Sequence, residues 1–483
     1  MIKVLLITPP YHCGVVEAAG SWLPLNLVYL AGALRNSGYE VEIYDAMTKF
    51  DSHEDIARHI KSRRPNVVAT GGFTATVNDC LKVLASAKEI DENIVTVLGG
   101  VHPTFCYHEI LTANRSVDYI VIGEGEVTFA ELLDCHFAHD NPEKVKGLAW
   151  RAEDSVMASK PREFISDLDS LTPAWDLIDW PLYTYRPTPG STLAVVSFAR
   201  GCVSKCSFCS QQLFWQASWR ARSPQSLVAE LRTLKTDYGV DVVMIADESP
   251  ATDGRIWRDL LNQLAQEDLG MEILMETRVV DVVRDEAIMD LYRKAGIVHI
   301  YVGVESGSQD TLARFNKDIK VEQSKQAIEL INKAGMISET SFVLGMPEDT
   351  AETINRTGEL AQYYNPDLAF FLAIAPWPYS DIYEELKPYI EVWDYSAYNL
   401  IEPIIKPQSM SRADVSKELI KAFRGFYLNK MKNLSQMSKF KQDYMMAVAK
   451  LLAEHSYLAK KMKMPGKFHD KLFETMGRKA GEK

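Results

Sequence analysis

The chain has 483 residues, of which 47% are hydrophobic and 24% are charged, and its formal net charge is −12 at pH 7. This composition is typical of a soluble globular protein of about two to four domains. The negative charge argues against general nucleic-acid binding. No run approaches the roughly 18–20 apolar residues of a membrane-spanning helix.

The first apolar run, residues 2–7, is followed by Thr8-Pro9-Pro10. It is too short for a signal peptide and lacks a small-residue cleavage site. We therefore expect it to be a first strand, and the protein to be cytoplasmic.

Residues 1–145 alternate short apolar runs with amphipathic stretches. Strands are expected at 2–7, 40–45, 67–71, 94–98 and 118–122, and helices near 24–37, 52–62, 76–89, 105–113 and 126–136. This alternation predicts an open α/β sheet of parallel strands joined by crossover helices. Such sheets bind ligands beyond the carboxyl ends of their strands.

Glycines and polar residues follow these expected strands. The candidate binding residues are His12, Gly14, Gly71, Gly72, Gly99, Gly100, His102, Thr104, Gly123 and Glu124. A glycine lets the backbone approach a bulky ligand where a Cβ would clash. Taken alone, the glycines are equally compatible with plain turns, and the two histidines with loop residues facing solvent.

Residues 146–190 contain five prolines among Trp and Tyr residues, which predicts an irregular but packed linker. The alternation resumes over 191–385. Strands are expected at 193–198, 240–246, 272–276, 298–304, 340–344 and 368–374, with helices near 224–237, 255–266, 284–294, 321–333 and 350–363. Six strand–helix units predict a partial barrel with its chemistry at the carboxyl ends of the strands.

Three cysteines, Cys202, Cys206 and Cys209, follow the first of these strands with the spacing Cys-x3-Cys-x2-Cys. Three thiolates on a short loop can hold a [4Fe–4S] cluster and leave one iron open. A zinc site would want a fourth Cys or His at matching spacing, and none follows. A disulfide is disfavoured in a chain without a secretory signal.

This loop, with Phe208 just before the last cysteine, resembles the radical S-adenosylmethionine superfamily. The resemblance implies that S-adenosylmethionine chelates the open iron through its amino and carboxylate groups. One electron from the cluster would then split it to a 5′-deoxyadenosyl radical.

Polar residues at the later strand ends have corresponding expected roles. Asp247 or Glu248 would accept hydrogen bonds from the ammonium group of S-adenosylmethionine, and Arg278 would bind its carboxylate. The family usually has Gly-Gly-Glu where this chain has Ala-Asp-Glu, which leaves the exact contact open. The remaining expected contacts are Glu305 and Ser306 with the ribose or methionyl end, and Val343 and Gly345 with the adenine. Each could also be an ordinary surface or ion-paired residue.

The segments Leu-Gly-Gly-Val-His-Pro-Thr and Gly-Glu-Gly-Glu of the first domain resemble the cobalamin-binding domain of class B radical enzymes. The family's Asp-x-His-x-x-Gly motif, whose His ligates cobalt, is missing. His12 has no Asp two residues earlier, and Gly14 is too close to it. We therefore expect His12 to make a polar contact near the corrin instead of binding cobalt.

The layout resembles, nearly throughout to about residue 430, the anaerobic magnesium-protoporphyrin IX monomethyl ester oxidative cyclase family. The segments that carry the resemblance lie at 97–105, 198–211, 293–299, 314–317 and 376–381. It implies closure of the isocyclic ring of chlorophylls without oxygen, on a tetrapyrrole substrate, with a flavodoxin- or ferredoxin-type electron donor.

Two other functions stay open at this point. Related enzymes methylate an unactivated carbon of a tetrapyrrole or other apolar substrate, and they need the same three cofactors. A non-enzymatic corrinoid carrier or sensor would not explain the cysteine loop.

Residues 386–483 are expected to be a mostly helical C-terminal region. From Lys430 onward it holds thirteen Lys or Arg against five Asp or Glu. A solvated basic helix surface explains this, and a peripheral contact with an anionic membrane is the alternative.

Overall fold

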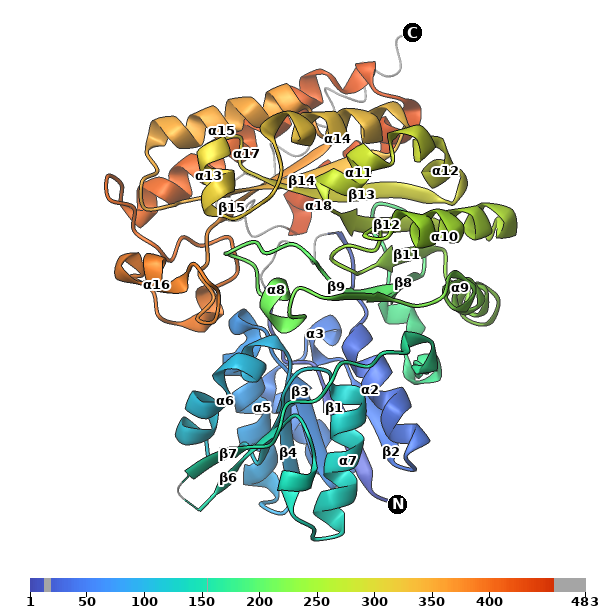
Figure 1. The fold of residues 1–483 in the computed structure, drawn as a ribbon, viewed down its shortest axis with the longest axis vertical. Coiled ribbons are helices and arrows are strands. Elements are labelled where there is room, and N and C mark those ends of the chain that lie inside the picture. Colours follow the sequence, from blue (N-terminus) through green and yellow to red (C-terminus); the bar gives the residue numbers. More distant parts are fainter. Residues whose placement is uncertain (13–18, 154, 456–483) are drawn as a thin grey trace.

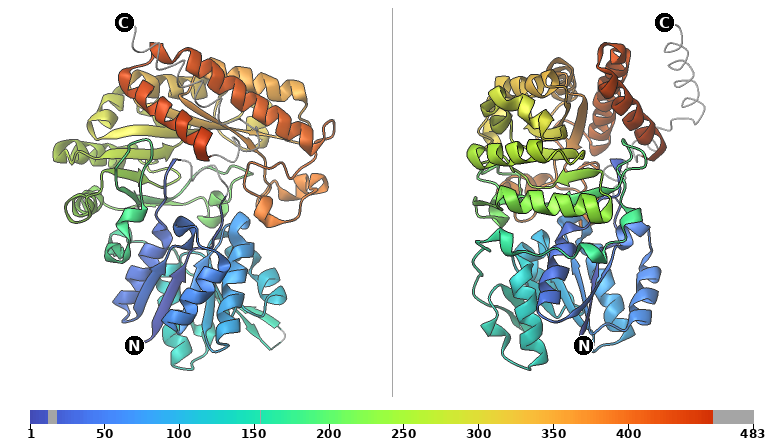
Figure 2. Two further views of the ribbon diagram at one scale, coloured as in Figure 1. Left: turned by 180° about the vertical axis from the view of Figure 1, so that it is seen from behind. Right: turned by 90° about the vertical axis from the view of Figure 1, so that its right-hand side faces the viewer.

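The computed structural model describes residues 1–12, 19–153 and 155–455. Two α/β units are stacked on one another, and the carboxyl-terminal helices cross the back of the second unit (Figures 1 and 2). The expected α/β class with a helical C-terminal region is confirmed. In the described residues, no helix has the length and apolar character needed to cross a membrane.

The first unit is a seven-stranded sheet with the order β2-β1-β3-β4-β5-β6-β7. Its first five strands are parallel, and β6 and β7 are added antiparallel. The strands are β1 (Lys3–Ile7), β2 (Glu40–Tyr44), β3 (Val67–Gly71), β4 (Val95–Gly99), β5 (Tyr119–Val121), β6 (Leu148–Ala152) and β7 (Ser155–Ala158). The helices are α2 (Leu25–Asn36), α3 (Ala46–Lys49), α4 (His53–Arg63), α5 (Val77–Ile90), α6 (Val101–Ala113) and α7 (Gly125–Phe137).

Both faces of this sheet are covered by helices. Successive side chains of a strand point to opposite faces, so Val4 and Leu6 pack toward α2 and α7, whereas Leu5 and Ile7 pack toward α4, α5 and α6. Burial on both faces explains why these strands are near-continuous apolar runs.

The strands β6 and β7, which lie within the expected linker, pair antiparallel and extend the first sheet. The following residues, to 192, are irregular with short 3-10 turns. Trp175, Tyr183 and Tyr185 are buried there, so this crossing segment packs against both units.

The second unit is a sheet of six parallel strands with the order β15-β14-β13-β12-β11-β8. The strands are β8 (Leu193–Val196), β11 (Val242–Ile245), β12 (Glu272–Thr277), β13 (Ile297–Glu305), β14 (Ile337–Leu344) and β15 (Leu368–Ala373). The longer helices are α9 (Pro224–Tyr238), α10 (Gly254–Glu267), α14 (Val321–Lys333) and α15 (Ala351–Tyr364), with α11 (Val279–Arg284), α12 (Met289–Lys294) and α13 (Gln309–Arg314) shorter. The order matches the expected partial barrel.

Two helices complete this unit, α17 (Arg412–Lys432) against α15 and β15, and α18 (Lys439–His455) at the amino-terminal end of the barrel. Tyr444 and Met445 of α18 share an apolar cluster with Leu274 of β12. The expectation of a solvated basic surface is wrong for Lys430 and Lys441, which are 4% and 6% exposed. They donate hydrogen bonds to Asn365 and Asp367, respectively. Residues 456–483, which hold most of the expected basic tail, lie outside the described residues.

Candidate active site between the two sheets

The three cysteines lie on the loop that follows the short strand β9 (Ala199–Gly201), which pairs antiparallel with β10 (Trp219–Ala221). Gly201 has a φ of +104°, and a Cβ there would lie 2.1 Å from the carbonyl oxygen of Ser218. Only glycine permits this start of the loop.

Two later segments, one after α13 and one after β15, hold the cysteine loop in place. Ser207 donates its N–H to the carbonyl of Phe315 at 2.9 Å and accepts a hydrogen bond from the N–H of Ile382 at 3.1 Å. The rings of Phe208 and Phe315 meet edge to face, 4.9 Å apart. Phe208 therefore anchors the loop by packing.

The donor set fits an iron–sulfur cluster better than a single ion. All three cysteines are free thiols and half-buried. Among the described residues, no three His, Cys, Asp or Glu side chains converge closely enough to hold one metal ion. A cluster binds each thiolate at a different iron. Burial raises the pKa of the Cys206 thiol, and that of Cys209 to about 12, so a cationic cluster would be needed to hold them as thiolates.

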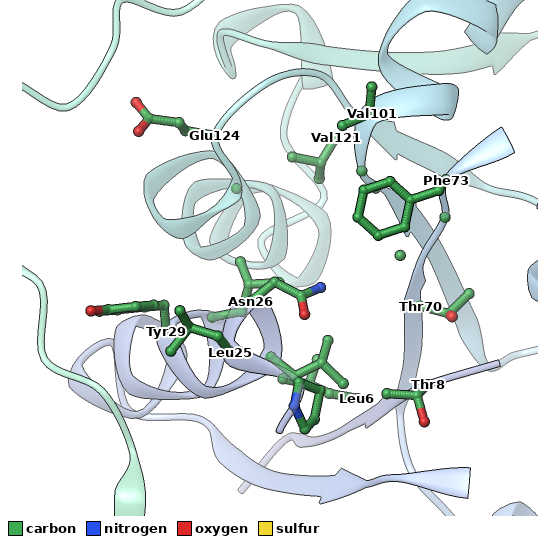
Figure 3. A pocket seen from close by; sticks show the side chains of 18 of the residues that line it. Leu6, Thr8, Leu25, Asn26, Tyr29, Thr70, Phe73, Val101, Val121 and Glu124 are labelled. Atoms are coloured by element: carbon green, nitrogen blue, oxygen red, sulfur yellow. The ribbon is translucent and has the colours of Figure 1, made fainter. Parts of the chain in front are cut away.

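A cavity of about 570 Å3 lies where the strand ends of the two units meet. Its floor is the carboxyl edge of the first sheet, and its lining includes Gly71, Gly72, Gly99, Gly100, Gly123 and Glu124 from the first unit with Ser197, Asp247 and Glu248 from the second. Phe73 is 62% exposed and turns its ring toward this space, with Leu25 and Asn26 of α2 across from it (Figure 3).

The glycine loops at the cavity pack on each other. Gly100 has a φ of +100°, and a Cβ there would lie 2.7 Å from the carbonyl oxygen of Gly72. Thr104 joins the loops, because its hydroxyl donates to the carbonyl of Gly100 at 2.8 Å and accepts from the N–H of Gly123 at 3.0 Å. Thr104 thus shapes the floor and is not part of the cavity lining.

The expected histidines lie elsewhere. His102 is buried in the first turn of α6, its Nδ1 3.1 Å from the hydroxyl of Thr74, and burial lowers its pKa to about 4. The alternative that His102 is a loop residue facing solvent is therefore wrong. His12 stacks on Phe50 at 4.4 Å. Gly14 lies outside the described residues. Among the described residues no histidine lines the cavity, so the glycine floor and apolar walls fit a corrinoid without a lower histidine.

Arg200, in β9, joins the two units. It donates to Glu124 at 2.7 Å and to Glu126 at 2.5 Å. Glu124 also accepts hydrogen bonds from Arg220 at 3.1 Å and from the N–H of Ile165 at 2.7 Å. Burial alone would lower the pKa of Arg200, but the two carboxylates outweigh it and raise it. The carboxylate of Glu124, expected as a cofactor contact, is therefore engaged by the protein.

The adjacent acids Asp247 and Glu248 have different environments. Asp247 is 3% exposed and accepts hydrogen bonds from the N–H groups of Phe198 at 2.8 Å and Ala199 at 2.7 Å. Burial raises its pKa to about 7. Its role here is to fix the end of β8 ahead of the cysteine loop. Glu248 is half-buried at the cavity, where burial raises its pKa, and it remains available to an ammonium group.

Arg278 and Glu305 also have protein partners. Arg278 forms a two-pronged pair with Asp281 at 2.7 and 2.8 Å. Glu305 pairs with Lys317 at 2.7 Å. Burial alone would lower the pKa of Lys317, but Glu305 and Cys206 raise it.

Three further expected contacts lie at the ends of β13 and β14. Ser306 is buried, and its hydroxyl accepts from the N–H of Ser308 at 3.1 Å. Val343 is half-buried, and Gly345, with a φ of +87°, donates its N–H to Asp349 at 2.8 Å.

Sequence reasoning missed Arg200, Arg220, Lys317 and Glu276. Arg200 stands two residues before Cys202, but nothing local indicates that its partners are in the other unit. Glu276 occupies an inward position of the apolar strand β12, and the alternation of that strand is the signal that could have identified it.

Comparison with known proteins agrees with this geometry. A family profile described as a B12 binding domain matches residues 11–133, and one described as the radical SAM superfamily matches residues 196–361. A solved radical S-adenosylmethionine methyltransferase from Kitasatospora setae, with cobalamin and a [4Fe–4S] cluster bound, covers 94% of this chain and is itself fully covered, with a TM-score of 0.70 at 15% identity. Fold and site define a cobalamin-dependent radical S-adenosylmethionine enzyme, with a [4Fe–4S] cluster, S-adenosylmethionine and cobalamin as cofactors.

Two curated relatives are more similar in sequence. Both are called anaerobic magnesium-protoporphyrin IX monomethyl ester cyclase. The one from Rubrivivax gelatinosus is 38% identical over 89% of this chain and 78% of its own length. The one from Cereibacter sphaeroides is 36% identical over 89% and 71%. The chain belongs to the family of these cyclases.

Proposed function

We propose that the chain catalyses the anaerobic oxidative cyclisation of magnesium-protoporphyrin IX monomethyl ester, which forms the isocyclic ring. The observation that carries this is the 38% identity to a cyclase across both cofactor-binding units. The likeness to the solved methyltransferase supports the fold alone, because only 15% of the residues are identical.

Residues of this chain have distinct tasks around the cofactors. Cys202, Cys206 and Cys209 would hold the cluster, and Glu248 would accept hydrogen bonds from the ammonium group of S-adenosylmethionine. The glycine floor would receive cobalamin. Bound together, these groups supply one-electron chemistry that removes hydrogen from an unactivated carbon.

Arg278, Glu305, Ser306, Val343 and Gly345 remain proposed contacts of S-adenosylmethionine. Arg278 and Glu305 are already paired with Asp281 and Lys317 in this structure. To bind S-adenosylmethionine, each would have to contact the cofactor and its present partner at the same time. The backbone at Val343 and Gly345 is better placed for recognition of a base edge, since its glycine leaves room for close approach.

The segment after β15 supplies an apolar wall for a flat tetrapyrrole. Trp377 packs in the same apolar cluster as Phe208 and Val343, near the cysteine loop. Tyr379 stacks on Phe105 at 4.8 Å and its hydroxyl lies 3.1 Å from that of Thr74, so it joins this wall to the first unit. Rigid aromatic groups offer stacking area at small entropy cost.

The test uses reconstituted enzyme without oxygen, with methyl-labelled S-adenosylmethionine, magnesium-protoporphyrin IX monomethyl ester and a flavodoxin- or ferredoxin-type donor. We expect 5′-deoxyadenosine and a cyclised product without methyl label. A product that carries a labelled methyl group would show a methyltransferase, and no conversion of any magnesium porphyrin would refute the proposal.

A further inference from the structure

The inner face of the barrel carries carboxyl groups on three neighbouring strands. Ile273 and Met275 of β12 pack outward with the helices. The alternate residue Glu276 therefore faces inward, as Glu305 of β13 and Glu339 of β14 do. An acidic interior is costly unless each charge is compensated.

Two of these three carboxyl groups have a nitrogen-bearing side chain beside them. Glu305 lies 2.7 Å from Lys317, and Glu339 lies 2.9 Å from Nε2 of His299. Glu276 makes no hydrogen bond or ion pair within the described part of the chain. Yet it keeps some accessible surface, which at this depth faces the interior of the barrel.

The position of Glu276 limits what can reach it. Leu274, two residues earlier on the same face of β12, packs with Tyr444 and Met445 of α18. The amino-terminal end of the barrel is therefore closed by apolar side chains and a helix. On the other side are Glu248 and Asp247, which line the cavity between the two units. A group that contacts Glu276 therefore enters from the cofactor side.

The charge state of Glu276 follows from its surroundings. Burial, followed by the carboxylates of Glu248, Glu339 and Asp247, raises its pKa to about 8. At neutral pH it is a neutral acid that can donate one hydrogen bond. The ionisable groups of the elements around it are Asp247, Glu248, His299, Tyr301, Glu305, Lys317, Glu339 and Tyr444.

We propose that Glu276 is a substrate-contacting residue that donates a hydrogen bond to the carbonyl oxygen of the methyl ester of the substrate, inside the barrel. This inference rests on the proposed function. The carboxylates of Glu248, Glu339 and Asp247, which raise the pKa of Glu276, would also repel an anion at the same place, so the site admits the esterified side chain and rejects a free carboxylate. Glu276 and its acidic neighbours would then explain selection of the ester over the diacid.

The first test compares magnesium-protoporphyrin IX monomethyl ester with the unesterified diacid in the reconstituted enzyme. We expect kcat/KM to be about a hundredfold lower for the diacid, because like charges in an interface cost several kcal/mol. Equal turnover of ester and diacid would overturn the selection argument.

The second test follows kcat/KM for the ester against pH. In the unchanged enzyme it should fall as pH rises past about 8, because Glu276 loses its donor proton. Glu276→Gln keeps a hydrogen-bond donor, so its kcat/KM should not fall above about pH 8. Glu276→Leu has no donor, so its kcat/KM should be about tenfold lower at all pH values. Glu339→Gln removes a negative charge that raises the pKa of Glu276, so in this variant kcat/KM should begin to fall at a lower pH. A Glu276→Gln profile that declines like that of the unchanged enzyme would overturn the proposal.

A substrate-free measurement separates this proposal from the proposed function. The difference between the infrared spectra of the unchanged protein and of Glu276→Gln, both without substrate, should show a protonated carboxyl band that disappears above about pH 8. If the band is present but no magnesium porphyrin is converted, the cyclase assignment fails and the protonated carboxyl stands. If cyclisation occurs and the band is missing, the proposal for Glu276 fails alone.

Discussion

The guanidinium of Arg200 lies 2.7 Å from the carboxylate of Glu124, which joins the cysteine loop to a strand end of the first sheet. The side chains are 12% and 4% exposed, so the pair is largely removed from water. Because Arg200 stands two residues before Cys202, this pair positions the cluster loop relative to the cobalamin cavity.

Replacing Arg200 by Ala should destabilise the protein and loosen this alignment. Removing one partner of a buried ion pair costs about 3–5 kcal/mol, because the other charge stays buried. Urea unfolding of the cluster-free protein would measure the loss. Arg35→Ala, which breaks the exposed pair with Asp176, is the matched control and should change stability by less than about 1 kcal/mol. Equal effects of the two substitutions would contradict the role of Arg200.

Replacing Cys206 by Ala should abolish both cluster binding and the cleavage of S-adenosylmethionine, because two thiolates cannot secure the cluster. Iron content and 5′-deoxyadenosine formation measure these outcomes after anaerobic reconstitution. Cys135→Ala, on helix α7 of the first unit, should leave both unchanged. Continued 5′-deoxyadenosine formation by the Cys206 variant would show that the loop is not the cluster site.

Much of the fold was predictable because its strands are buried on both faces. The run at 67–71, for example, coincides with β3, and the run at 272–276 with most of β12. The strand pair β6-β7 was missed because two short antiparallel strands leave no long periodic pattern. The helix expected near 284–294 is instead the last residue of α11, a 3-10 turn at Glu286–Ile288 and the short helix α12.

The site was predictable where its residues are adjacent in sequence, as in the cysteine loop. It was not predictable where partners are distant. Glu124 contacts Arg200, which is 76 residues away in the sequence. His102 contacts the rings of Tyr379 and Tyr395, which follow the last strand of the barrel. Asp247 and Glu248 share a strand end, and only the folded chain shows which of them binds the backbone.

Replacing Gly100 by Ala should weaken cobalamin binding. The new Cβ would lie 2.7 Å from the carbonyl oxygen of Gly72, and the φ of +100° is unfavourable for alanine, so the cavity floor must shift. Titration with cobalamin, followed by absorbance, should show at least about a tenfold weaker affinity. Gly425→Ala, in helix α17 with no atom nearer than 4.0 Å, is the control. An unchanged affinity for the Gly100 variant would contradict the proposed floor.

The cobalt of bound cobalamin should have no lower histidine, because no histidine of the described residues lines the cavity. The electron paramagnetic resonance spectrum of the Co(II) form should lack nitrogen splitting from an imidazole. His12→Ala and His102→Ala should leave this spectrum unchanged. An imidazole splitting that disappears in His12→Ala would instead identify His12 as a cobalt ligand.

The central claim is that this chain closes the isocyclic ring of a magnesium porphyrin without dioxygen, and the resemblance to the cyclase family implies that the new oxygen comes from water. The most direct measurement is the mass of the product formed from magnesium-protoporphyrin IX monomethyl ester in oxygen-18 water without dioxygen. The account predicts a cyclised product with one oxygen-18 atom and no added methyl group. A product heavier by a methyl group and free of oxygen-18 would contradict it.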